Sequence, residues 1–248
     1  MLRFLCCSCF SSENSANERQ PLLQPRPPDL NEPASARQIP PARSETVRRT
    51  GRLVVRRMDV PELDHRFSDV AETFNKQQEH YEAMVQHISS LRQSCNCAQG
   101  NTLAFADCVG TIREEYKATY KVSIKMNGYD FSLSVVPVGS EGKHEDEPLP
   151  PCLKLAQNEL RGTSESARAT ISKGTKLQEL FAWLLRSRDE MAEQVKGAAS
   201  SYQDQGRLTN NLEENIKEVR RAKELSMGYK QRAGEVLTEA AQVAGANM

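Results

Sequence analysis

Three cysteines near the N-terminus, Cys6, Cys7 and Cys9, carry the most distinctive chemistry in this sequence. They lie among apolar residues, in a chain whose hydrophobic share is only 38%. Cytosolic thiols beside apolar residues that contact a membrane are acceptors for palmitate. One acyl chain holds a protein only marginally, whereas two or more anchor it stably. The cluster therefore predicts thioester acylation of all three thiols, and a tail whose thiols carry no lipid is the alternative.

Other uses of the N-terminal residues fit the sequence less well. N-myristoylation requires glycine after the initiator methionine, where this chain has Leu2. A secretory signal peptide would need a longer apolar stretch, and a mitochondrial presequence would lack acids such as Glu13 and Glu18. We therefore expect a reducing compartment, in which disulfides are rare. No set of cysteines has the usual spacing of zinc ligands, so the later ones are predicted to be structural thiols: Cys95, Cys97, Cys108 and Cys152.

A short motif follows the cysteines. Residues 18–23, Glu-Arg-Gln-Pro-Leu-Leu, resemble the acidic dileucine sorting signal, with Glu18 as the acid and Leu22 and Leu23 as the leucines. The resemblance implies that clathrin adaptor complexes bind this segment. The order of cysteine cluster and dileucine is similar to that of small acylated proteins on lysosomes and related organelles. We therefore expect the cytoplasmic face of endosomal, lysosomal or Golgi-derived membranes, with the mitochondrion as the alternative.

Residues 1–50 are predicted to form a disordered tail, because they are rich in Ser, Asn, Pro and Arg and proline interrupts regular helix. Arginines outnumber acids at the end of this tail and just beyond it. Anionic cytoplasmic leaflets attract such segments by roughly 1 kcal/mol per basic residue near the surface. A nuclear localisation signal and a solvated linker are the alternatives. The predicted membrane-contact residues are Arg48, Arg49, Arg52, Arg56 and Arg57.

Apolar residues recur with 3,4 spacing from Val60 to Cys95, which is the heptad pattern of a helix that packs against other helices. One position is polar, Gln77, and a lone polar layer fixes register and partner number at some cost in stability. This layer resembles the central glutamine layer of SNARE motifs. The predicted helix interface, with other helical proteins or with a second copy, comprises Leu63, Phe67, Val70, Phe74, Gln77, Tyr81, Met84, Ile88 and Leu91.

The clearest local pattern is a β-hairpin. Asn127 and Gly128 stand between two runs of alternating apolar and polar residues, which predicts a type I′ turn. The expected register pairs Met126 with Tyr129, Ile124 with Phe131, and Val122 with Leu133. Because an isolated hairpin is marginally stable in water, its apolar face should pack on helices or on a partner.

The expected fold is therefore mainly α: long amphipathic helices in a helical bundle or coiled coil, one β-hairpin insertion and a disordered N-terminal tail. A break in the first helical region is expected at residues 99–101, and a continuous helix with a soft spot there is the alternative. A capping box from Thr175 to Gln178 is expected to begin a helix. The predicted segments are the tail (1–50), the heptad region (51–118), the hairpin (119–138), an acidic, proline-containing linker (139–151) and the C-terminal helices (152–248).

No phosphate-binding loop, HExxH motif or nucleophile elbow occurs, so we expect a non-enzymatic protein without cofactor, metal or small-molecule substrate. A net charge of zero gives no overall footprint for nucleic acid. The predicted function is a lipid-anchored peripheral membrane adaptor that binds partner helices in vesicle trafficking or organelle positioning. The alternatives are a SNARE-like or tethering-complex subunit, and a structural coiled-coil protein of mitochondria or the cytoskeleton.

Overall fold

The computed structural model describes residues 51–97, 103–139 and 148–245, all within one compact unit that begins at Arg48. Helices dominate these residues, which confirms the predicted mainly α fold with one β-hairpin. The predicted tail and the predicted break at residues 99–101 lie outside the described residues. The elements are α1 (Pro61–Ser94), α2 (Ala106–Tyr116), β1 (Tyr120–Asn127), β2 (Asp130–Pro137), α3 (Pro151–Arg186), α4 (Arg188–Ala198) and α5 (Tyr202–Ala244).

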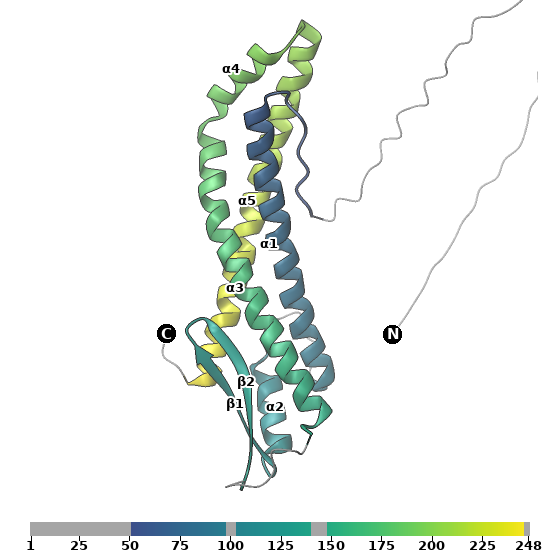
Figure 1. Ribbon diagram of the computed structural model, residues 1–248, viewed down its shortest axis with the longest axis vertical. Helices are drawn as coiled ribbons and strands as arrows, with labels where there is room; N and C mark the ends of the chain where they lie inside the picture. The colour runs from purple at the N-terminus through teal and green to yellow at the C-terminus, as the bar shows by residue number, and fades with distance from the viewer. Residues whose placement is uncertain (1–50, 98–102, 140–147, 246–248) are drawn as a thin grey trace, which may run out of the picture. The chain divides into compact units, whose positions relative to one another are not determined.

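The three long helices α1, α3 and α5 lie side by side in alternating directions (Figure 1). The longest, α5, would extend about 64 Å if straight. The heptad positions of α1 face α3 and α5 of the same chain, and they are buried except for Tyr81, which is half-buried. The seam is therefore packed within this chain.

Two apolar cores lie along this bundle, one on each side of Gln77. The upper core joins the first half of α1, the end of α3, α4 and the first half of α5. The lower core joins the end of α1, α2, the hairpin, the start of α3 and the end of α5. Between them Gln77 is fully buried, and its Nε2 donates at 3.2 Å to the carbonyl oxygens of both Thr170 and Ser226. A polar layer thus links all three long helices.

The hairpin forms, but in a register different from the predicted one. Asn127 pairs with Asp130, so Gly128 and Tyr129 are the turn residues. Gly128 has a φ of 60° and Tyr129 does not have a positive φ, which fits a type II′ turn rather than type I′. Each predicted partner moves by two residues, so the same side chains still share one face. The observed apolar pairs are Met126 with Phe131, Ile124 with Leu133, and Val122 with Val135.

One predicted helix boundary also differs from the structure. The predicted capping box at Thr175 is wrong, because α3 is continuous there and the Thr175 hydroxyl donates to the Ile171 carbonyl at 3.1 Å. Ser201, in contrast, caps α5 by accepting a hydrogen bond from the Asp204 N–H. α1 and α3 each begin with proline, whose fixed φ suits the first helical turn.

Candidate functional site

Residues 51–58 form an extended segment, here called the strap, which lies against α1 and α5 (Figure 1). The strap runs antiparallel to α1, since Leu53 lies beside Asn75 and Met58 lies beside Asp64. Two of its side chains, Leu53 and Met58, are 2% and 0% exposed and belong to the upper core. The strap is therefore an integral part of the bundle.

Two asparagines bind the strap through its main chain. Asn75 of α1 accepts from the Leu53 N–H at 2.8 Å and donates to the Leu53 carbonyl at 3.1 Å. Asn215 of α5 makes the same pair of bonds with Arg56, both at 2.7 Å. A carboxamide carries a donor and an acceptor side by side, so it pairs with a peptide unit much as a neighbouring β-strand would.

Further side chains complete this binding. Asn211 donates to the Arg57 carbonyl at 2.8 Å, and Asp64 accepts from the Met58 N–H at 2.7 Å. Arg221 donates to the carbonyls of Gly51 and Arg52 at 3.1 and 3.2 Å. Side chains of α1 and α5 thus bind eight main-chain groups of the strap.

Both ends of the strap have special backbone geometry. Gly51 has a φ of 78°, and a Cβ there would lie 2.9 Å from Nε2 of Gln78, so this position suits glycine on two grounds. Asp59, which turns the chain into α1, has a φ of 57°. Its carboxylate accepts a hydrogen bond from Arg207 at 3.0 Å. The same guanidinium hydrogen-bonds Asp204 and lowers the pKa of that carboxyl.

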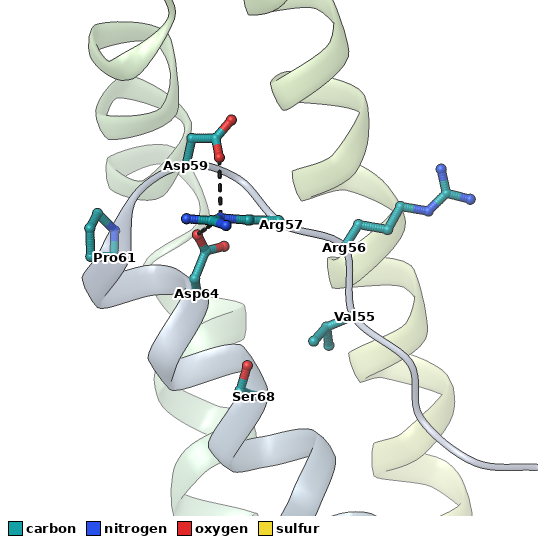
Figure 2. Close-up of a pocket in the computed structure, with 7 residues that line it drawn as sticks. All are labelled: Val55, Arg56, Arg57, Asp59, Pro61, Asp64 and Ser68. Carbon is teal, nitrogen blue, oxygen red and sulfur yellow. Dashed lines mark ion pairs between the residues drawn. The ribbon is translucent and has the colours of Figure 1, made fainter.

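A polar pocket lies where the strap joins α1 (Figure 2). The Arg57 guanidinium lies between the carboxylates of Asp59 and Asp64, at 3.3 and 3.9 Å. Arg56 points away from these acids, and its side chain is exposed. Most charges of the pocket are thus paired within the chain. The pocket is lined by Val55, Arg56, Arg57, Asp59, Pro61, Asp64 and Ser68.

The predicted site residues fall into two groups. The acylation, sorting and first arginine positions lie outside the described residues: Cys6, Cys7, Cys9, Glu18, Leu22, Leu23, Arg48 and Arg49. Of the other predicted membrane-contact residues, Arg52 forms an ion pair with Glu79 at 2.9 Å, and Arg57 forms ion pairs with Asp59 and Asp64. The bundle thus binds this basic segment through its main chain, and the Arg56 side chain faces solvent.

The later cysteines gather near the lower core. Cys95, Cys97, Cys108 and Cys152 are all free thiols. Burial, together with the neighbouring Cys152 and Cys97, raises the pKa of Cys95 to about 12. Burial also raises the pKa of Cys108, with a further contribution from its hydrogen bond to Cys97. Within the described ranges, no three His, Cys, Asp or Glu side chains are placed to hold a metal ion.

Sequence reasoning missed the residues that bind the strap. Asparagine is a poor helix former, yet Asn75, Asn211 and Asn215 all lie in helix interiors. That mismatch was the available clue, since such residues are retained where their side chains bind something specific. The partner segment was not predictable, because it lies as many as 170 positions away in sequence.

Comparison of the chain with protein-family models, curated proteins and solved structures finds no match. Among the helices of the described part, none is long and apolar enough to cross a bilayer.

Proposed function

We propose that the protein is a non-enzymatic adaptor, anchored by acyl chains on Cys6, Cys7 and Cys9 to the cytoplasmic face of endosomal or lysosomal membranes. Its helical bundle binds partner proteins in vesicle trafficking or organelle positioning. The acidic dileucine of Glu18, Leu22 and Leu23 is proposed to recruit clathrin adaptor complexes for its sorting.

The observation that carries this proposal is the docking of the strap. The strap directly follows the segment that holds the proposed anchor and sorting motif. Eight main-chain hydrogen bonds and two buried side chains attach it to α1 and α5. The bundle thus holds the main chain from Gly51 onward, beside Arg221 in α5, directly after the segment proposed to carry the anchor.

The packing of the α1 seam favours an autonomous adaptor over a SNARE-like subunit. A SNARE-like or tethering-complex helix would offer its heptad face to other proteins, whereas here that face contacts α3 and α5. Purified protein should therefore be folded and monomeric without a partner. Purified protein that is unfolded until mixed with other helical proteins would favour the subunit instead.

Membrane fractionation tests the anchor. A Cys6→Ser, Cys7→Ser, Cys9→Ser variant should move from membranes to the soluble fraction, and hydroxylamine, which cleaves thioesters, should release the unmodified protein. Cys152→Ser is the control, because that thiol belongs to the bundle. Unchanged membrane association of the triple variant contradicts acyl anchoring.

Imaging tests the sorting motif separately. Leu22→Ala with Leu23→Ala should shift the protein from lysosome-like puncta to the plasma membrane or Golgi while acylation persists. Leu30→Ala is the control in the same tail. The same compartment for both variants means that the dileucine match is accidental.

A further inference from the structure

The bundle has three grooves between its long helices, and the chain's own segments cover two of them in the upper half. The strap fills the groove between α1 and α5. α4 packs chiefly on α5 and more weakly on α3 (Figure 1). Between α1 and α3 at this level, the side chains that line the pocket belong, among the described residues, to these two helices alone. This third groove, called the α1/α3 groove below, contains a cavity of about 460 Å³.

The floor and walls of the α1/α3 groove are apolar. Val70 and Leu184 form part of the buried core beneath it, while Leu180 and Trp183 are only partly buried. Trp183 is the single tryptophan of the chain. A half-buried tryptophan in an apolar groove is a typical anchoring point for an apolar side chain of a partner.

The polar side chains that line the groove are three acids, one arginine and His65. Arg66 covers the ring of Trp183 at 4.0 Å, and Glu62 neutralises this arginine at 2.9 Å. The other two acids, Asp69 and Glu179, line the groove and form no ion pair with any described residue. The groove therefore presents two carboxylates without an ion-pair partner among the described residues, beside an apolar surface.

The α1/α3 groove differs from the strap groove in what it can bind. Asparagine side chains in the strap groove bind an extended main chain. The α1/α3 groove is lined by acidic, basic and apolar side chains and by no amide side chain. Such a lining recognises side chains, and an amphipathic helix presents apolar and charged side chains in parallel stripes. The lining residues run from Glu62 to Val70 in α1 and from Glu179 to Leu184 in α3, so a helix lying along these antiparallel helices contacts both walls.

We propose that the α1/α3 groove docks an amphipathic helix of another protein, whose apolar stripe packs on Leu180 and on the part of Trp183 that Arg66 leaves exposed, and whose flanking lysines or arginines pair with Asp69 and Glu179. The proposal rests on the proposed adaptor function and names its partner-binding surface. It goes beyond the heptad seam, which is occupied within the chain.

Trp183 provides a direct test, because its fluorescence reports only on this groove. The full chain, purified without acylation and free of membranes, is titrated with a synthetic Leu/Lys amphipathic peptide of about 18 residues, or five helical turns. The expected result is a saturable change in tryptophan emission. Asp69→Asn with Glu179→Gln should weaken binding about three- to tenfold, as expected for two exposed ion pairs. Because no membrane is present, loss of acyl anchoring and loss of groove binding are distinguished.

Matched controls separate specific docking from general attraction of charges. Glu190→Gln with Glu213→Gln removes the same charge from exposed positions that do not line the groove, and should leave the affinity unchanged. A Leu/Glu peptide of the same pattern should bind far more weakly. The proposal is overturned by the absence of a saturable emission change, by equal losses in the two double variants, or by equal affinity for the acidic peptide. Glu179→Gln alone provides a second variant, since this residue is exposed on α3.

Discussion

Removal of the Asn215 side chain should loosen the strap without unfolding the bundle. Asn215 is 1% exposed and binds both the N–H and the carbonyl of Arg56. In Asn215→Ala both bonds are lost. Because Arg56 itself is exposed, water can replace them in part, and the cost is the net value of two hydrogen bonds, about 2 kcal/mol.

The strap should respond strongly to a loss of this size. Burial of Leu53 and Met58 contributes roughly 4 kcal/mol, and eight main-chain bonds contribute about 1 kcal/mol each. Against this stands the ordering of eight residues at about 1.5 kcal/mol each. The two sides are equal to within a few kcal/mol, so the docked state is favoured by only a few kcal/mol. While the docked state predominates, a loss of about 2 kcal/mol raises the undocked population about 30-fold.

Amide hydrogen exchange measures the undocked population. The informative probes are the N–H groups of Leu53 and Met58, because their own partners, Asn75 and Asp64, are unchanged in the Asn215→Ala protein. Both amides should exchange about 30-fold faster. Trypsin should also cleave sooner after Arg56 and Arg57. The bundle itself should remain stable, since alanine is the better helix former within α5.

Asn210→Ala is the matched control, because Asn210 lies in the same helix but is exposed and makes no bond to the strap. If Leu53 and Met58 exchange at the same rate in the two variants, the strap is held by its buried side chains alone. That result would refute the argument that the asparagines bind it.

Three further predictions concern the bundle. Gly174→Ala places a Cβ 2.6 Å from Gln77 Nε2, so it should lower the free energy of unfolding by about 1–2 kcal/mol. Adding Gln77→Ala should relieve this clash, which a double-mutant cycle measures. Gly162→Ala places a Cβ 2.5 Å from the His87 ring, which is held in place by a hydrogen bond with Glu159. The midpoint of thermal unfolding should therefore fall in Gly162→Ala and rise again when His87→Ala is added. The pKa of Cys95 is raised to about 12, so its contribution to the free energy of unfolding is complete below the unfolded value of about 8.5 and is lost as pH rises through about 12. Denaturation at increasing pH should therefore show a steeper loss of stability in the wild type than in Cys95→Ala, which keeps the raised pKa of Cys108.

The sequence predicted the buried face of α1 almost completely, for a simple physical reason. A helix that packs along its length must repeat apolar residues every three or four positions, and Leu63, Phe67, Phe74 and Met84 do so. The same logic identified Gln77 as a polar layer. What it contacts was not predictable, because Thr170 and Gly174 become its neighbours only through the pairing of α1 with α3.

The hairpin shows the limit of local rules. Asn-Gly favours a type I′ turn, but the register also depends on which side chains pack on the helices. In the observed register, Phe131 stacks on Phe105 at 5.7 Å, and its N–H donates to Ser164. These contacts come from α3 and from the residue before α2, so no pattern inside the hairpin could reveal them. Tyr129, expected in a strand, is 70% exposed in the turn.

The heptad seam of α1 cannot serve as both the core of the bundle and a binding surface. Binding another helix through it would remove α1 from both cores and expose side chains such as Phe67, Phe74 and Met84. Each would cost roughly 1.5–3 kcal/mol, so a few of them approach the whole stability of an ordinary domain. A partner that binds without unfolding the protein must use the outer surface. The adaptor proposal therefore depends on surfaces such as the α1/α3 groove, and a heptad pattern in a single sequence does not show whether the opposing helices belong to the same chain.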